Sequence, residues 1–280
     1  REFMLAMQAF SRQQNWEMAL GVLPRMQEED VQPDVLSYNA ALSACARSAQ
    51  WERALGLLAR MNEEVVEPDM VSYSAAMNAC GKGEQWEQAL WVLADMGKLA
   101  VERDVISYST MISACEKGEQ WELALLLLAD MKEEQVEQNV FSYTAAVRAC
   151  SRGEQWQRAF AIFDEMQHQD VAPSIVSYSV AISACEEGKQ WEQALEMLID
   201  MRRHVIERDV ISYSSAISAC EKSGQWEWAL VLLSDMQEQR IELNVVSYNA
   251  AFSAYEKGEQ WERALHMLSE MQEQDVEQDV

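Results

Sequence analysis

The stretch MVSYSAAMNACGKGEQWEQALWVLADMGKLAVERD, residues 70–104, decides the fold, because the rest of the chain repeats its pattern. Its first part is rich in small residues that suit a helix, and it ends near Gly83, a helix stop signal. A second helix is predicted from about Gln85. Its apolar residues follow the spacing i, i+3, i+4, i+7 and i+10, which forms one stripe on a helix: Trp86, Ala89, Leu90, Leu93 and Met96.

This pattern recurs every 35 residues along the whole chain. The recurring tryptophans are Trp16, Trp51, Trp86, Trp121, Trp156, Trp191, Trp226 and Trp261, and a Met column keeps the same period. The chain, 1–280, is therefore predicted to be a single array of eight repeats. Their boundaries are 1–34, 35–69, 70–104, 105–139, 140–174, 175–209, 210–244 and 245–279. Neither helix of a repeat can bury its stripe alone, so the repeats must stack into an α-solenoid. Val280 opens a further repeat, which predicts a segment of a longer protein.

Composition excludes several classes of protein. The hydrophobic fraction of 49% is too high for a disordered chain. No apolar run reaches the roughly 18 residues of a membrane span, so no membrane partner is expected. The net charge of −25 at first disfavours nucleic acid, because proteins that bind phosphate backbones usually show a basic surface.

The cysteines repeat at one position: Cys45, Cys80, Cys115, Cys150, Cys185 and Cys220. Equivalent sites in stacked helices lie about 8–10 Å apart, which is too far for a disulfide, so buried thiols are predicted. The Trp and Met columns are likewise predicted to be core. The chain has no CxxC pair, and its histidines, His168, His204 and His266, are scattered, so no metal site and no cofactor are expected. It also lacks a catalytic motif, so it is predicted not to be an enzyme.

The repeats resemble a known family. The 35-residue period, the Val-x-Ser-Tyr opening, the Trp-Glu-x-Ala-Leu-x-x-Leu-x-x-Met helix and the Pro-Asp ending at Pro33-Asp34 and Pro68-Asp69 look like pentatricopeptide repeats. The resemblance covers the whole chain. It implies a right-handed α-solenoid whose first helices line the concave side and bind single-stranded RNA, one base per repeat. It also implies RNA processing or stabilisation in a mitochondrion or chloroplast.

In this family, the residue after the Tyr and the last residue of the repeat contact the base. An acceptor-only carboxylate at the last position suits uracil or guanine, which carry a ring N–H, whereas an amide suits adenine or cytosine. The residue after the Tyr sorts by size: Ser or Thr goes with purines and Asn with pyrimidines. The pairs are Asn39 with Asp69, Ser74 with Asp104, Ser109 with Asn139, Thr144 with Ser174, Ser179 with Asp209, Ser214 with Asn244, and Asn249 with Asp279. They predict the site 5′-N-U-G-A-(A)-G-A-U-3′, in which the parenthesised base is ambiguous.

Two further columns match family positions. Residues that sandwich each base would be Leu36, Val71, Ile106, Phe141, Val176, Ile211 and Val246. The alternative for these residues is inter-repeat core. Residues that contact the phosphates would be Arg12, Arg47, Lys82, Lys117, Arg152, Lys222 and Lys257. Glu187 breaks this basic column and puts phosphate contact in doubt in its repeat.

The charge has a different meaning once it is placed on the repeats. The first-helix segments hold ten Lys+Arg and ten Asp+Glu, so the whole excess of −25 lies on the second helices and loops. Those are predicted to face outward, about 10 Å further from the RNA, where salt with a Debye length of about 8 Å screens much of their field.

A second hypothesis is a scaffold that binds protein segments in its groove, as tetratricopeptide arrays do, and the acidity favours it. Against it, a protein-binding solenoid has no reason to restrict the residue after the Tyr to Asn, Ser or Thr in seven successive repeats. We therefore favour RNA. The acidic convex face is a candidate surface for protein partners, and the chain is expected to be a monomer.

Overall fold

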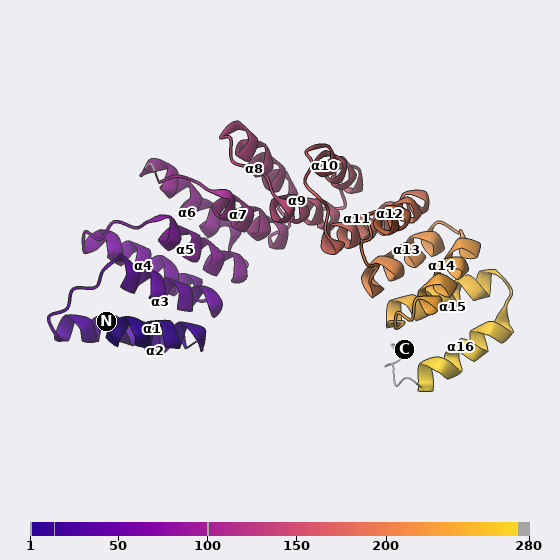
Figure 1. Cartoon of the computed structure of the whole chain (residues 1–280), viewed down its shortest axis with the longest axis horizontal. Coiled ribbons are helices and arrows are strands. Elements are labelled where there is room, and N and C mark those ends of the chain that lie inside the picture. The colour runs from indigo at the N-terminus through magenta and orange to yellow at the C-terminus, as the bar shows by residue number, and fades with distance from the viewer. Residues whose placement is uncertain (1, 14, 100, 274–280) are drawn as a thin grey trace. The chain divides into compact units, whose positions relative to one another are not determined.

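The computed structural model describes residues 2–13, 15–99 and 101–273, which form sixteen helices and no strand (Figure 1). The first helices of the repeats are α1 (Glu2–Arg12), α3 (Val35–Arg47), α5 (Met70–Lys82), α7 (Val105–Lys117), α9 (Val140–Arg152), α11 (Ile175–Gly188), α13 (Val210–Lys222) and α15 (Val245–Lys257). The second helices are α2 (Trp16–Glu28), α4 (Trp51–Glu63), α6 (Trp86–Lys98), α8 (Trp121–Glu133), α10 (Trp156–His168), α12 (Trp191–Arg203), α14 (Trp226–Glu238) and α16 (Trp261–Glu273). The predicted fold class, an all-α array of helical repeats, is confirmed.

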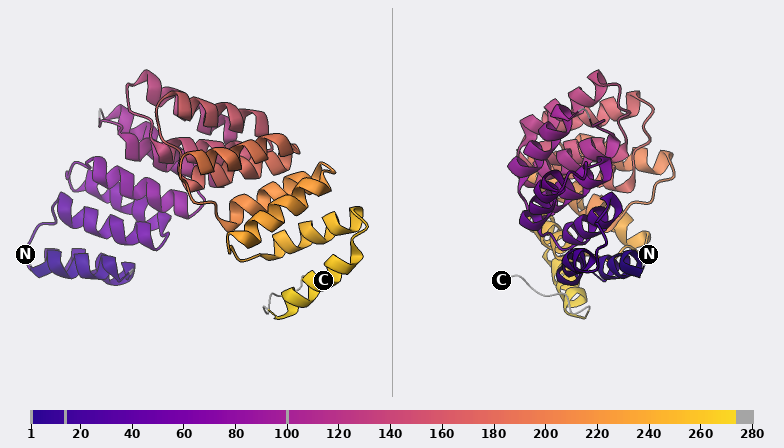
Figure 2. Two further views of the ribbon diagram at one scale, coloured as in Figure 1. Left: turned by 45° about the vertical axis from the view of Figure 1, so that its right-hand side comes forward. Right: turned by 90° about the vertical axis from the view of Figure 1, so that its left-hand side faces the viewer.

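The helices pack in two layers within each of two units, Arg1–Ala149 and Cys150–Val280. In the first unit, α1, α3, α5 and α7 pack side by side in that order, and α2, α4 and α6 each pack on the first helix of their own repeat and on the next one. In the second unit, α11, α13 and α15 form the equivalent layer, and α12 and α14 pack on it in the same way (Figure 2). Each unit therefore has a layer of first helices and a layer of second helices.

The core lies between these layers. Tyr38 and its equivalents in the later repeats are at most 1% exposed, and the Met column of the second helices, represented by Met131, is equally well buried. All six cysteines are buried and free, as predicted. Burial raises the pKa of Cys80 to about 11, so this thiol stays protonated at neutral pH. The cysteines act as small apolar residues of the core.

The Trp column differs from the expectation of a core position. Seven of its members are only half-buried, and Trp261 is 66% exposed. Four of the indole rings, those of Trp51, Trp86, Trp156 and Trp226, pack on a glycine at the end of the following first helix. A Cβ added at Gly83, for example, would lie 2.6 Å from Cδ1 of Trp51. The ring therefore covers a junction between repeats at the edge of the layer, and a glycine is what lets it approach.

The turns between helices use left-handed residues. The backbone of Gly83 has an ordinary φ of −82°, and Glu84 after it takes φ 58°. The side chain of Gln85 then closes the turn, since its Nε2 donates to the carbonyl of Gly83 at 3.2 Å. After the second helices, Val65 and Val205 also lie in the left-handed region, with φ 57° at both. A β-branched residue is strained in this conformation.

Candidate nucleic-acid interface

In the described part of the chain, the last residue of each repeat from 1–34 to 210–244 caps the first helix of the next. Oδ1 of Asp69 accepts a hydrogen bond from the backbone N–H of Ser72 at 2.9 Å, and the hydroxyl oxygen of Ser72 lies 2.9 Å from the same atom. Burial raises the pKa of Asp69, but the hydrogen bonds from Ser72 and Asn39 outweigh it and leave that pKa below its ordinary value. The same capping position is occupied by Asp34, Asp104, Asn139, Ser174, Asp209 and Asn244. A carboxylate, amide or hydroxyl oxygen thus stands at the amino end of these first helices.

Two of the predicted base-reading pairs are in direct contact. Nδ2 of Asn39 donates to Oδ1 of Asp69 at 3.0 Å, across 30 residues of sequence. The hydroxyl of Ser72 donates to Oδ1 of Asn39 at 2.6 Å, which closes a three-residue network. In the second unit, the hydroxyl oxygen of Ser179 lies 3.2 Å from Oδ1 of Asp209 and 2.8 Å from the carbonyl oxygen of Ile175 in its own helix. The fold therefore brings these two pairs, Asn39 with Asp69 and Ser179 with Asp209, together at the amino ends of the first helices.

The other members of the column after the Tyr are held differently. Hydroxyl groups of Ser109, Thr144 and Ser214 donate to main-chain carbonyls of their own helices, at 2.6, 2.6 and 3.1 Å. Ser74 is half-buried, and Asn249 is exposed. The predicted partner of Asn249, Asp279, lies outside the described residues. Thr144 and its predicted partner Ser174 belong to different units.

The apolar column stands open beside these residues. The exposed fractions are 62% for Leu36, 50% for Val71, 60% for Ile106, 76% for Phe141, 51% for Val176, 53% for Ile211 and 47% for Val246. These values do not fit the alternative of inter-repeat core. Each of these side chains lies at the second position of its helix, close to the capping residue. A row of exposed apolar groups next to polar groups suits the faces and edges of flat rings.

The basic column lies at the opposite ends of the same helices, about 16 Å away along the helix axis. Nη1 of Arg47 donates to the carbonyl of Ser11 at 3.1 Å, and Nζ of Lys117 donates to the carbonyl of Gly81 at 3.0 Å. Arg12, Lys82, Arg152, Lys222 and Lys257 are exposed. All of these positions belong to the first-helix layer that carries the other columns.

The acidic residues that precede the basic column were missed from the sequence. Nζ of Lys222 lies 2.8 Å from Oε1 of Glu186, and Nζ of Lys257 lies 2.7 Å from Oε1 of Glu221. A signal was available, because the dipeptide Glu-Lys recurs at the end of three first helices. The sequence does not show that Lys222 and Lys257 contact a glutamate of the preceding repeat rather than the glutamate beside them.

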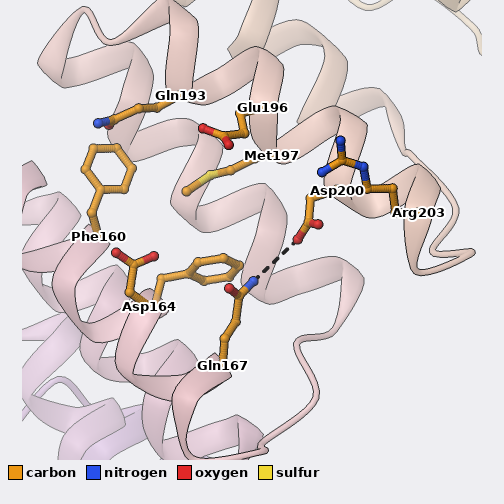
Figure 3. Close-up of a pocket in the computed structure, with 9 residues that line it drawn as sticks. Phe160, Asp164, Gln167, Gln193, Glu196, Met197, Asp200 and Arg203 are labelled. Carbon is orange, nitrogen blue, oxygen red and sulfur yellow. Dashed lines mark hydrogen bonds between the residues drawn. The ribbon is translucent and has the colours of Figure 1, made fainter.

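A surface pocket of about 300 Å³ lies on the second-helix layer, between α10 and α12 (Figure 3). Phe160 and Met197 line it together with the carboxylates of Asp164, Glu196 and Asp200. Among the described residues, no group of His, Cys, Asp or Glu side chains is arranged to hold a metal ion. Because all of its lining residues belong to α10 and α12, the pocket is separate from the first-helix layer that carries the predicted base-reading, apolar and basic columns.

No helix in the described ranges combines the length and apolar character that a membrane crossing requires.

Comparisons with known proteins agree with the repeat pattern. Models of the pentatricopeptide repeat domain match residues 6–48 and 21–83, and the pentacotripeptide-repeat region of PRORP matches residues 70–225. Models of the PPR repeat match residues 208–255 and 246–276. The comparison with curated proteins found no match.

Solved structures share the fold. The pentatricopeptide repeat protein PPR10 from maize, also solved in complex with an 18-nt psaJ RNA element, aligns with a TM-score of 0.64. It is 21% identical, and the alignment covers 99% of this chain but 44% of the maize chain, so this chain spans less than half of that protein. The PPR domain of Arabidopsis thaliana protein-only RNase P 1, in complex with tRNA, aligns with a TM-score of 0.55 and 18% identity over 60% of this chain and 89% of that one. With one family model matching more than half of its length, the chain belongs to the pentatricopeptide repeat family.

Proposed function

We propose that this chain binds single-stranded RNA selectively, one base per repeat, and does not itself catalyse a reaction. The observation that carries the proposal is the network of Asn39, Asp69 and Ser72, in which the two predicted reading positions meet although 30 residues separate them. Exposed Leu36 and Val71 stand on the same helices one or a few residues away. Polar edges beside apolar faces are what a planar base requires.

The comparisons support RNA as the class of ligand. PPR10 was solved with an RNA element and the PRORP1 repeat domain with tRNA, although both are distant from this chain in sequence. Asp69 beside Asn39 favours uracil, because a carboxylate accepts from the ring N–H, and Asp209 beside Ser179 favours guanine for the same reason. We therefore keep 5′-N-U-G-A-(A)-G-A-U-3′ as the proposed site. Action in an organelle, in RNA processing or stabilisation, is proposed from the family resemblance.

The decisive experiment measures binding of the chain to labelled single-stranded RNA that carries the proposed site, against RNA of the same composition in scrambled order. We expect tighter binding to the proposed site by about 5- to 150-fold for each base that is read, borrowing the scale of bidentate base contacts. Equal binding to both RNAs, or binding to neither, would refute selective recognition. The RNA should also stay intact during the incubation, since cleavage by the purified chain would contradict the non-catalytic proposal.

A single substitution tests the code. Asn39→Ser shortens the side chain next to Asp69 and should move the preference at that one base from uracil toward guanine. The matched control is Asn78→Ser, because Asn78 is an exposed residue of the next first helix outside the predicted columns. A base preference that is the same in both variants and in the parent chain would argue that this column does not read bases.

A further inference from the structure

The first helices of neighbouring repeats contact one another in a fixed register near their carboxyl ends. Counting from the first residue of a repeat, as in Val35, the residue at position 12 meets the residue at position 13 of the next repeat, 36 residues later. Four contacts of basic residues follow this rule: Arg47 with Ser11, Lys117 with Gly81, Lys222 with Glu186 and Lys257 with Glu221. At these four places, the residue at position 12 supplies the partner of the next basic residue.

The kind of partner differs between the two units. In residues 1–149, Arg47 and Lys117 donate to backbone carbonyls, which carry no net charge, so both cations keep their charge for a further partner. In residues 150–280, Lys222 and Lys257 face glutamate carboxylates at 2.8 and 2.7 Å. A carboxylate at this distance neutralises the cation locally.

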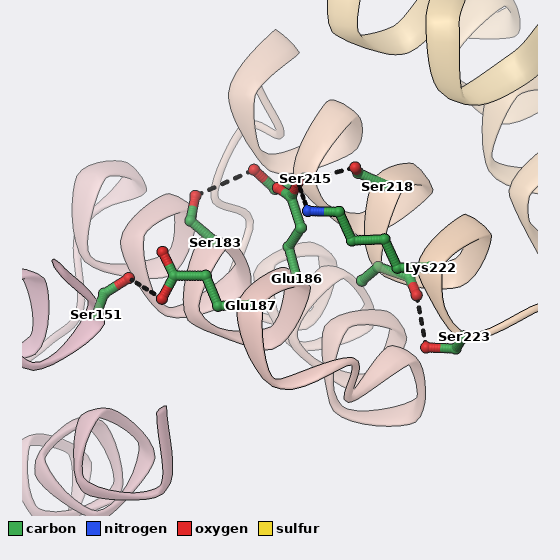
Figure 4. Close-up of polar contacts among 9 residues, drawn as sticks. Ser151, Ser183, Glu186, Glu187, Ser215, Ser218, Lys222 and Ser223 are labelled. Carbon is green, nitrogen blue, oxygen red and sulfur yellow. Dashed lines mark hydrogen bonds and ion pairs between the residues drawn. The ribbon is translucent and has the colours of Figure 1, made fainter. Parts of the chain in front are cut away.

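The glutamates are themselves held in place. Oε1 of Glu186 accepts from the hydroxyl of Ser218 at 2.8 Å as well as from Lys222 (Figure 4). Oε1 of Glu221 accepts in the same way from Ser253 at 2.7 Å. The hydrogen bonds from Lys257 and Ser253 lower the pKa of Glu221, so this carboxyl is ionised at neutral pH. Each glutamate is therefore held by a serine as well as by a lysine of the next repeat.

Another repeat of the second unit, 175–209, has no basic residue at position 13. Glu187 stands at position 13, and its Oε2 accepts from the hydroxyl of Ser151, at position 12 of the preceding repeat, at 3.1 Å (Figure 4). The register is thus kept while the charge is reversed. In the first unit, by contrast, Glu116 at position 12 is paired with Arg148 at position 9 of the next repeat, 3.5 Å away.

Resting on the proposed RNA binding, we propose that the residue at position 12 sets how strongly the following repeat holds the RNA backbone. Repeats whose cation faces Glu186 or Glu221 attract a phosphate weakly, because the phosphate competes with a carboxylate already in place. The backbone is held mainly by residues 1–149, and residues 150–280 act mainly through their base contacts. The chain therefore reads bases along the whole site but holds the RNA backbone mainly over the 5′ part.

The test removes the competing carboxylates. In the double variant Glu186→Gln and Glu221→Gln, the amides still accept from the serines, but the two lysines are released for phosphates. Each phosphate contact on single-stranded nucleic acid contributes about 0.7 to the salt slope, or about fourfold in affinity at physiological salt, so we expect up to about 14-fold tighter binding and a slope steeper by up to about 1.4. The matched control is Glu192→Gln with Glu227→Gln, which makes the same change in net charge on exposed residues of α12 and α14. Equal effects of the two double variants on the salt slope would overturn the proposal.

A second experiment tests the same proposal by removing lysines instead of glutamates and comparing the loss of RNA affinity. Lys82→Gln with Lys117→Gln should lower the affinity by up to about 14-fold, whereas Lys222→Gln with Lys257→Gln should lower it less, because those cations are already paired. Equal losses would contradict the proposal. Circular dichroism during urea unfolding verifies that all variants are folded at the temperature of the binding assay. If the parent chain binds no RNA, the proposed function fails; if it binds and the pairs of variants do not differ, only this inference fails.

Discussion

Asp69 caps α5 and is also predicted to read a base, and substitutions at this residue can separate the two roles. Replacing Asp69 by Asn keeps an oxygen that can accept from Ser72, and Asn139 in this chain makes the same cap, accepting from the N–H of Ser142 at 2.9 Å. Asn and Asp are about equally good at an N-cap, so the free energy of unfolding should change by less than about 0.5 kcal/mol. The base contact changes in kind, however, since an amide can donate to a bare ring nitrogen. Beside Asn39, the preference should move from uracil to cytosine.

The assay uses four RNAs that differ only at the base opposite repeat 35–69. A contact worth about 1–3 kcal/mol predicts that Asp69→Asn reverses a ratio of about 5- to 150-fold between uracil and cytosine. Asp69→Ala is the comparison, because it removes both tasks: it should lose the base preference and also about 1 kcal/mol of stability with the cap. The reasoning is refuted by an Asp69→Asn variant that still prefers uracil, or by one that is destabilised as much as Asp69→Ala.

Three further predictions concern stability. Val205→Asn should raise the free energy of unfolding in urea by about 1 kcal/mol, because Val205 has φ 57° and is 90% exposed, so asparagine relieves backbone strain there while little apolar burial is lost. The control Val231→Asn, on an exposed residue within α14, should give no gain in stability. Equal changes in the two variants would argue against backbone strain at Val205. Tyr178→Phe should cost about 1 kcal/mol in the same assay, since Asp200 loses a donor at 2.6 Å, and an unchanged urea midpoint would contradict this. The hydrogen bond from the hydroxyl of Ser37 lowers the pKa of the Asp34 carboxyl below its ordinary value. The ionised carboxylate therefore stabilises the folded chain above that ordinary value, and this stabilisation is lost as the pH falls through the lowered pKa of the folded state. Thermal unfolding measured from neutral to acid pH should therefore depend less on pH in Asp34→Asn than in the parent chain, and equal pH dependence would refute the assignment.

The helices could be predicted closely from the sequence. The second helix expected from about Gln85 begins at Trp86 with Gln85 as its N-cap, and the predicted buried thiols are buried. The reason is repetition: an apolar stripe and a capping residue that recur at one spacing state the same local preference eight times. Local preferences of this kind determine where helices start and which face they bury.

The contacts between repeats could not be predicted in this way. Whether position 12 meets position 12 or position 13 of the next helix depends on how far packed helices are shifted along each other, and no periodicity within one helix records that shift. The pairing of Lys222 with Glu186 and the link between Asn39 and Ser72 both depend on it. The Trp column was misjudged for a similar reason, since its partner, the residue at position 14, belongs to the following repeat.

The hydrogen bond between the last residue of one repeat and the third residue of the next determines where such a chain can be cut and joined to another without losing the helix cap. A segment that begins at Met70 and ends at Asp104 carries a complete predicted reading pair, but it separates Asp104 from Ser107, the residue that Asp104 caps. A segment of equal length that runs from Ser74 to Tyr108 carries the pair and the cap together. Gene exchange or module grafting with joints directly after the tyrosines would thus transfer a predicted reading pair together with the cap that holds its last residue. The segment that can be exchanged intact therefore starts four residues after the repeat boundary that the sequence period suggests.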